Sequence, residues 1–222
     1  MTFQRARSEE QRAARRQAVL HTAEAMLAEM PVAALSLNEL SRRVGLAKSN
    51  VLRYFESREA VLLELLDIAW REWLDALATA LPPRDATVPV AERIERVAAV
   101  LARTLVGHPM LCELGSASAG VLEHNVSADV AARFKRAAQA DTIALGRLVR
   151  GVVPELGETA AERFAAATVL VTGSLWAYSR PSAAMLAAYE ADPELAAMRM
   201  DFAVAVRDLL ATLLAGLLAR PG

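Results

Sequence analysis

The residues best suited to chemistry lie between positions 36 and 55, in the stretch SLNELSRRVGLAKSNVLRYF. Five side chains occupy the outer face of a short helix that this stretch predicts, and none of them is acidic: Lys48, Ser49, Asn50, Arg53 and Tyr54. Each can donate a hydrogen bond to the phosphate oxygens or base edges of duplex DNA. The pattern therefore predicts a surface that binds nucleic acid.

Two short predicted helices position these donors. Ser36 and Glu39 form a capping box that opens a helix over residues 37–44, and Gly45 ends it. A second helix follows over residues 48–55, so the segment has the helix-turn-helix plan, in which the second helix enters the major groove. The apolar residues of both helices are expected to face inward: Leu37, Leu40, Val44, Leu46, Val51 and Phe55.

Arg53 and Lys48 are expected to contact different parts of the DNA. The forked guanidinium of Arg53, one and a half turns into the second helix, suits the two acceptors of guanine. Lys48 stands at the helix start, where a point charge suits phosphate. If Arg53 binds phosphate instead, Asn50 becomes the leading base reader. A helix-loop-helix without DNA binding is the alternative, and the acid-free face beside Arg42 and Arg43 argues against it.

Residues 13–66 resemble the N-terminal DNA-binding domain of the TetR family of bacterial transcriptional regulators. The resemblance rests on Val19, Leu20 and Ala23 and on the run LSLNELSRRVGLAKSNVLRYFESREAVLLELL. Residues 55–59 of this run are similar to the family's Phe, any residue, Ser or Asn, Lys, acidic residue. The resemblance implies DNA contacts from eight residues: Ser36, Asn38, Lys48, Ser49, Asn50, Arg53, Tyr54 and Arg58.

The N-terminal arginines are either an arm along the DNA backbone or part of a solvated, disordered tail: Arg5, Arg7, Arg12, Arg15 and Arg16. One position departs from the family pattern. Where the family commonly has a tyrosine that touches a phosphate, this chain has Leu52, which packs either on a thymine methyl group or in the domain's own core. Arg58 replaces the usual lysine and keeps its charge while offering a forked donor.

Helix start and stop signals cover the rest of the chain, and no alternating pattern is long enough for a strand. Predicted helices span residues 8–29, 57–81, 89–106, 109–120, 128–153 and 158–179, with Ser8, Ser57 and Ser127 as caps. A last helix is predicted to start at Asp192-Pro193, after an irregular turn over 181–189. We therefore predict an all-α fold of about nine helices. A three-helix DNA-binding domain occupies residues 8–60, and a helical domain for effector binding and dimerisation occupies 61–222.

Charge supports this division. The 222-residue chain has a net charge of −1, but residues 1–58 carry a net +4 and residues 59–222 a net −5. A basic N-terminal part and an acidic remainder are expected when only the N-terminal part binds a polyanion. A single cysteine and an N-terminus without an apolar core indicate a reducing cytoplasm. Binding to DNA there would associate the protein with the nucleoid. The longest uncharged stretch, 164–179, is shorter than the roughly 18–20 residues of a membrane span, so no membrane partner is expected.

Two late helices are apolar over more than one face, and such helices need cover on both sides. The resemblance implies the same arrangement, because that family typically dimerises through its last two long helices as a four-helix bundle. The alternative for either helix alone is a purely internal position. The predicted interface of a homodimer comprises Leu170, Phe202, Val206, Leu209, Leu213 and Leu217.

An unknown small-molecule effector is expected in the body of the protein. Its candidate contacts are His108, Cys112, His124, Phe134, Arg150 and Trp176. His108 and Cys112 have the four-residue spacing of two metal ligands, but further ligands are missing nearby, and a core histidine with a buried thiol is favoured. We expect no metal and no cofactor.

Taken as a sequence, the chain is best interpreted as a homodimeric, ligand-responsive transcriptional repressor that binds a palindromic operator in double-stranded DNA. The alternative is a helical ligand-binding or scaffold protein whose helix-turn-helix has lost DNA affinity, which only Leu52 favours. We expect no enzymatic activity, because the sequence has neither a glycine-rich phosphate loop nor a nucleophile elbow.

Overall fold

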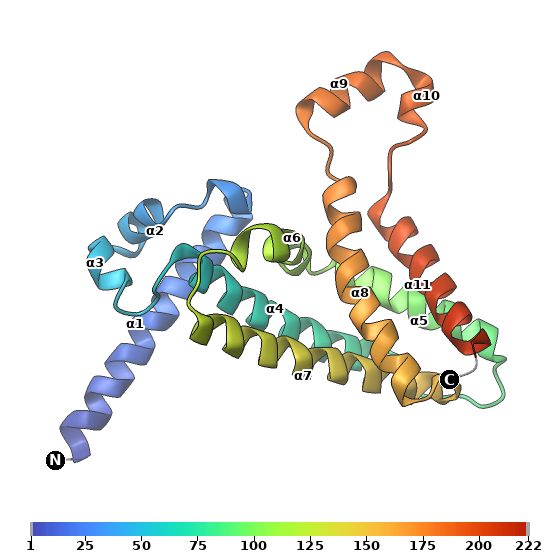
Figure 1. Ribbon diagram of the computed structural model, residues 1–222, viewed down its shortest axis with the longest axis horizontal. Coiled ribbons are helices and arrows are strands. Elements are labelled where there is room, and N and C mark those ends of the chain that lie inside the picture. Colours follow the sequence, from blue (N-terminus) through green and yellow to red (C-terminus); the bar gives the residue numbers. More distant parts are fainter. Residues whose placement is uncertain (1, 221–222) are drawn as a thin grey trace. The chain divides into compact units, whose positions relative to one another are not determined.

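Helices follow one another along the whole course of the chain in Figure 1. The computed structural model describes the backbone of residues 2–220 and the side chains of residues 9–118 and 120–220. Residues 2–220 contain no strand, which confirms the predicted all-α fold. The chain divides into two compact units, one formed by residues up to 68 together with 117–135, the other by 69–116 and the residues from 136 onward.

The first unit begins with α1 (Thr2–Glu29), η1 (Val32–Ala34), α2 (Leu37–Val44) and α3 (Lys48–Val51). The division between the units falls within α4 (Arg58–Ala80) and α7 (Ala128–Val152), and α6 (Pro109–Ala117) continues into a π-helical turn, η2 (Ser118–Leu122). The second unit contains α5 (Val90–Val106), η3 (Pro154–Leu156), α8 (Glu158–Tyr178), α9 (Ala183–Ala191), α10 (Pro193–Ala196) and α11 (Phe202–Ala219).

Three of the predicted serine caps are confirmed. The Oγ atoms of Ser36, Ser57 and Ser127 accept hydrogen bonds from backbone N–H groups three residues on, at 3.2, 3.1 and 3.3 Å. Ser8 is not a cap, because α1 already begins at Thr2. The predicted cap signal at Ser8 therefore lies inside a longer helix.

Two predicted boundaries near the C-terminus are wrong. Residues 181–189, expected as an irregular turn, lie largely within α9, whose cap is Ser182. Asp192 does cap a helix with Pro193 at its first position, but that helix, α10, lasts a single turn. The last long helix begins instead at Phe202, where Asp201 caps it by accepting from the Val204 N–H at 2.9 Å.

The core of the second unit lies where α11 packs along α5 and α8. Its fully buried side chains include Trp73, Leu101, Phe164, Val206 and Leu214. The start of α5 is fixed by Arg93, whose guanidinium donates to the Val152 carbonyl at 2.7 Å and to Glu155 at 2.6 and 3.0 Å. This clasp joins the ends of α5 and α7 to η3.

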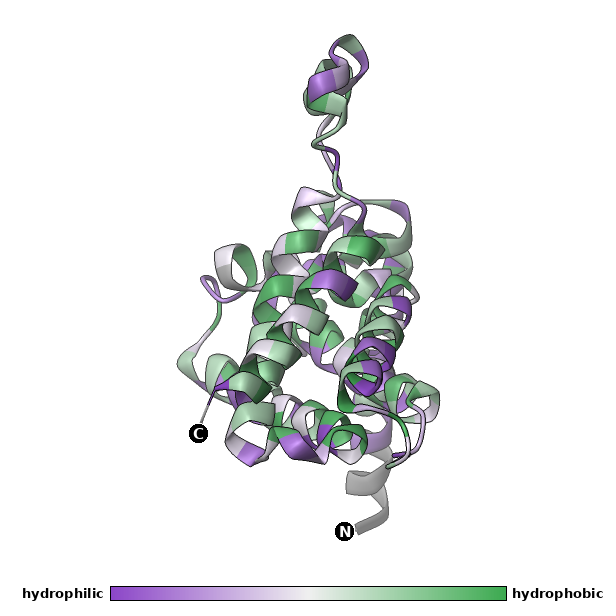
Figure 2. Cartoon of the chain, turned by 90° about the vertical axis from the view of Figure 1, so that its right-hand side faces the viewer, coloured by the Kyte–Doolittle hydropathy of each residue, from purple (hydrophilic) through white to green (hydrophobic). Residues whose placement is uncertain are grey.

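The segment containing α9 and α10 projects from the ends of α8 and α11 (Figure 1). Neither short helix has a buried residue, and both hydrophobic and hydrophilic positions are visible on the segment in Figure 2. By length and composition α11 could cross a membrane, and 28% of it is buried inside the chain, although it carries the charged residues Arg207 and Asp208. Its packing along α5 and α8 makes it a core helix with one uncovered side.

Candidate nucleic-acid interface

The turn between α2 and α3 depends on one glycine. Gly45 has φ +73°, in the left-handed region where a side chain would be strained. The amide of Leu46 then donates to the Ser41 carbonyl at 3.0 Å, which closes the end of α2. Because Leu40 and Val51 are both fully buried, the two helices are anchored to the same core, and the rest of α3 is turned outward.

Three of the four residues of α3 are exposed: Lys48, Ser49 and Asn50. None is acidic, and together they offer an ammonium, a hydroxyl and an amide. These groups can serve both phosphate and base edges. The structure thus presents this part of the sequence-predicted surface in one short helical segment.

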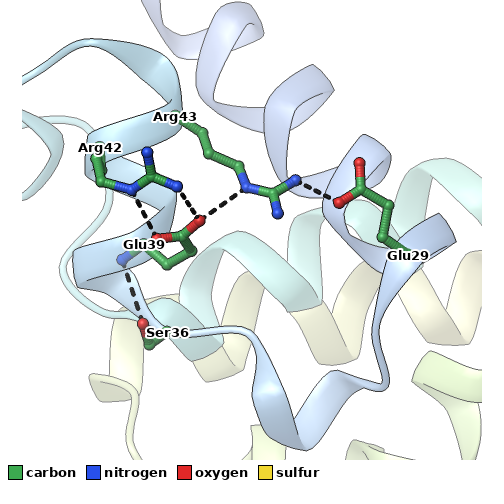
Figure 3. Close-up of polar contacts among 5 residues, drawn as sticks. All are labelled: Glu29, Ser36, Glu39, Arg42 and Arg43. Carbon is green, nitrogen blue, oxygen red and sulfur yellow. Dashed lines mark hydrogen bonds and ion pairs between the residues drawn. The ribbon is translucent and has the colours of Figure 1, made fainter.

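The two arginines at the end of α2 are neutralised within the protein (Figure 3). Glu39 accepts from Arg42 at 2.6 and 2.9 Å and from Arg43 at 2.9 Å. These hydrogen bonds lower the pKa of Glu39 to about 2. Arg43 also donates to Glu29 at 2.7 Å, so the network ties α2 to the end of α1. Arg42 and Arg43 therefore hold the motif together instead of adding free positive charge to it.

The predicted helix over residues 48–55 is shorter than expected, because α3 ends at Val51. The amides of Arg53 and Tyr54 donate to carbonyls three residues back, at 3.2 and 2.9 Å, which tightens the chain into turns. Arg53 and Tyr54 consequently lie past the end of α3 and not on it.

Arg16 of α1 holds this tightened end in place. Its guanidinium donates to the Tyr54 carbonyl at 2.7 Å, lies 4.2 Å from the centre of the Phe55 ring, and forms a two-pronged ion pair with Glu64 on α4. No local pattern predicts this contact, because Arg16 and Glu64 are 48 residues apart. Arg16 therefore does not belong to the predicted arm of free arginines.

The other predicted contacts differ in availability. Asn38 is exposed, and Ser36 is exposed while its Oγ caps α2. Arg58 is turned inward, because it donates to the Leu35 carbonyl at 3.0 Å and to Glu59 at 3.1 Å. Leu52 is 42% exposed, so the alternative that places it in the domain's own core does not hold.

The remaining arginines of the predicted arm lie on α1, whose helical backbone starts at Thr2 and replaces the disordered-tail alternative. The side chains of Arg5 and Arg7 lie outside the described residues. Arg12 and Arg15 are exposed, and they line a hollow together with Gln11, Arg53 and Tyr54.

The structure divides the six predicted effector contacts between the units, with His124 and Phe134 in the first and the other four in the second. His108 Nδ1 lies 2.7 Å from the Thr104 carbonyl. Burial raises the pKa of the Cys112 thiol to about 12, so it stays protonated. Among the side chains described, no three potential metal ligands gather.

The remaining two effector candidates in the second unit have partners of their own. Arg150 approaches Glu158 at 3.9 Å. Trp176 is 8% exposed and donates from Nε1 to Glu113 at 2.8 Å, while Arg180 stacks over its ring at 4.8 Å. Glu113 therefore lies beside Trp176 and accepts its hydrogen bond.

The predicted dimer residues fall into three groups. Leu170 on α8 is 72% exposed. Leu209, Leu213 and Leu217 on α11 are half-buried. Phe202 and Val206 are buried within the chain itself, where Phe202 packs edge-on against Trp176 at 5.0 Å between ring centres. Because these two side chains are buried within the chain, they are not available for contact with a second copy.

Comparison with known proteins places this architecture in a family. The family "Bacterial regulatory proteins, tetR family" matches residues 19–65, and "Tetracyclin repressor-like, C-terminal domain" matches residues 67–221. The HTH-type transcriptional regulators EthR of Mycobacterium tuberculosis and Mycobacterium bovis are each 44% identical over 50 residues, or 22% of this chain. That match spans 23% of the length of each of these relatives.

Two solved structures share the fold. A TetR/AcrR family regulator from Thermobifida fusca matches 94% of this chain and 100% of its own, with 20% identity and a TM-score of 0.53. A TetR transcriptional regulator from a Rhodococcus species matches 94% of this chain and 97% of its own, with 16% identity and a TM-score of 0.52. Since residues 67–221 alone are most of the chain, it belongs to the TetR family of bacterial regulatory proteins, and α2 and α3 form its helix-turn-helix.

Proposed function

We propose that this regulator is a homodimeric, ligand-responsive repressor that binds a palindromic operator, with a DNA-binding domain over residues 8–60 and an effector and dimerisation domain over 61–222. The observation that carries the proposal is the acid-free run Lys48, Ser49 and Asn50, exposed on α3 and anchored from behind by Val51. Two such helices related by a two-fold axis would read two half-sites about one helical turn apart or slightly more. The protein would act in the cytoplasm, at the nucleoid.

The proposed dimer rests on the uncovered sides of α8 and α11. Leu170 and Tyr178 of α8 are 72% and 76% exposed, and Val204 of α11 is 66% exposed. Residues 164–178 of α8 carry no charge, so exposure of this side of the helix to water is unfavourable. A second copy would cover both helices at once and form a four-helix bundle.

Sedimentation velocity tests the dimer. The wild-type chain should sediment as a dimer at micromolar concentration, and Leu170→Glu should sediment as a monomer because it places a charge in the apolar interface. Val106→Glu, on an equally apolar and 48% exposed position of α5, is the matched control and should remain dimeric. A monomeric wild type would contradict the dimer.

The proposed ligand response is supported by one hydroxyl in the second unit. Thr172 of α8 is 7% exposed, and its Oγ1 has no hydrogen-bond partner among the described residues. A buried polar atom without a partner costs free energy that a bound ligand can recover. In the proposed dimer, an effector would relieve repression only under one condition. It must bind the state in which the two DNA-binding domains are too far apart to fit the operator more tightly than it binds the DNA-bound state.

A screen of small molecules scored by release of a fluorescein-labelled operator duplex tests this response. Thr172→Val keeps the shape of the side chain and removes the hydroxyl. It should reduce the potency of an active compound without changing operator affinity in its absence. Unchanged potency would remove Thr172 from the effector site.

DNA binding itself is tested by selecting bound fragments from genomic DNA with the purified protein, followed by footprinting. We expect protection of an inverted repeat and higher expression of the adjacent gene when the regulator is deleted. Affinity should fall at least about ten-fold for a few-fold rise in salt, because several phosphates are neutralised. Weak binding to all DNA sequences, with an affinity that does not depend on salt, would favour the alternative of a scaffold protein without DNA affinity. Leu52, in place of a phosphate-binding tyrosine, is the feature that suggests this alternative.

A further inference from the structure

A hollow beside the reading helix is lined by three arginines. Its volume is about 360 Å³, and its lining residues are Gln11, Arg12, Arg15, Arg53 and Tyr54. The first three belong to α1, while Arg53 and Tyr54 belong to the tightened turn after α3. Segments about forty residues apart thus contribute three arginine residues to the lining of one hollow within the first unit.

The charges of these arginines are not compensated locally. Arg12 and Arg16 lie four residues apart and therefore share a face of α1. Arg16 is neutralised by Glu64, but within the described part of the chain none of Arg12, Arg15 and Arg53 forms an ion pair. The hollow has no acidic lining residue. Like charges that line one hollow repel one another, and an anion bound between them relieves the repulsion.

The chemistry of the lining suits phosphate. Guanidinium groups offer paired N–H donors that match two phosphate oxygens, and the Tyr54 hydroxyl and Gln11 amide add further donors. One wall is held in a fixed position, because Arg16 binds the Tyr54 carbonyl at 2.7 Å. The site is therefore partly organised before any ligand arrives.

The length of α3 decides which phosphate would reach the hollow. Four helical residues span about 6 Å, whereas the major groove is about 12 Å wide. When Ser49 and Asn50 face the bases, a residue just past the end of α3 meets the phosphates along the edge of the groove. Arg53 occupies that position.

We propose that Arg12, Arg15 and Arg53 form one phosphate-binding site that takes a backbone phosphate of the operator. Arg53 then contributes affinity without sequence preference, and base reading falls to Ser49 and Asn50. This assignment replaces the base-reading role that spacing alone suggested for Arg53. It rests on the proposed function, since the phosphate belongs to an operator.

Selection from a randomised DNA library tests the assignment, with binding measured between 50 and 300 mM salt. Arg53→Ala and Arg12→Ala should each weaken operator binding about ten-fold or more, because a charge-assisted hydrogen bond is lost. Each should make the salt slope shallower by about one unit per subunit, with the base preference kept at every position. Asn50→Ala should change the preference at one base pair per half-site, while Arg147→Ala, an exposed arginine of α7, should change nothing. Loss of base preference in Arg53→Ala, or an unchanged salt slope, would overturn the proposal.

A titration with inorganic tripolyphosphate separates this site from the proposed function. We expect tripolyphosphate to bind the wild-type chain and to displace operator DNA, and to bind Arg12→Ala at least about ten-fold more weakly. If the wild type binds no DNA, the proposed function fails. Tripolyphosphate binding that depends on Arg12 would then assign the hollow to a free polyphosphate and overturn the operator assignment. Absence of tripolyphosphate binding would overturn the site itself.

Discussion

Replacing Arg16 by methionine tests whether Arg16 stabilises residues 52–55, which follow α3. Methionine keeps much of the apolar stem but removes every interaction of the guanidinium. Those interactions are the ion pair with Glu64, the hydrogen bond to the Tyr54 carbonyl at 2.7 Å and the stacking over Phe55 at 4.2 Å. We expect Arg16→Met to loosen residues 52–55 and to weaken operator binding.

The size of the effect follows from the exposure of the partners. The side chains of Arg16 and Glu64 are 40% and 30% exposed, so solvent screening limits their ion pair to about 1 kcal/mol or less. The hydrogen bond to the Tyr54 carbonyl contributes about 1 kcal/mol, and the stacking on Phe55 about 0.5–1 kcal/mol. Arg16→Met should therefore cost about 2–3 kcal/mol. Glu64→Gln, which removes only the ion pair, should cost about 1 kcal/mol or less.

Amide hydrogen exchange measures this difference where it should occur. A loss of 2–3 kcal/mol corresponds to exchange about 30- to 150-fold faster at the amides of residues 53–55, since every 1.4 kcal/mol is ten-fold. Amides of α11, in the second unit, serve as the internal control. Equal effects of Arg16→Met and Glu64→Gln, or unchanged exchange at residues 53–55, would refute the role of Arg16.

Three further predictions concern packing, pH and reactivity. A Cβ added at Gly173 would lie 3.2 Å from the Gly115 carbonyl oxygen, so Gly173→Ala should lower the free energy of unfolding by about 1–3 kcal/mol in urea titrations; Gly151→Ala, which meets open space, should change it by less than about 1 kcal/mol. The folded-state pKa of Glu39 is about 2 against its usual 4.5. Wild type should therefore be more stable than Glu39→Gln above pH 4.5 and lose that advantage as the pH falls towards 2, and parallel stability–pH curves would contradict this. Because burial raises the pKa of Cys112 to about 12, iodoacetamide at pH 8 should label the unfolded chain and not the native one, as mass spectrometry can show.

The sequence by itself determined those features whose causes lie within a few residues. The caps at Ser36, Ser57 and Ser127 depend on hydrogen bonds between residues three positions apart. The end of α2 at Gly45 depends on the φ angle of that single residue. These local rules, with helical spacing of apolar residues, predicted the all-α fold and the order of α2 and α3. They also identified the exposed donors of α3, because the burial of Val51 fixes which side of so short a helix faces outward.

Only the tertiary structure decided which charged side chains remain available. Arg16, Arg43 and Arg58 are indistinguishable from free DNA-binding arginines in the sequence, yet each is neutralised or turned inward by a partner. Two of the partner contacts join residues 14 and 48 apart, and Arg58 reaches the carbonyl of Leu35, 23 residues away. The structure also ends α3 at Val51, four residues before the predicted end, and the Tyr54 carbonyl beyond it accepts from Arg16. Such partners are set by how helices pack, and packing depends on the three-dimensional fit of buried side chains, which no spacing rule along the chain contains.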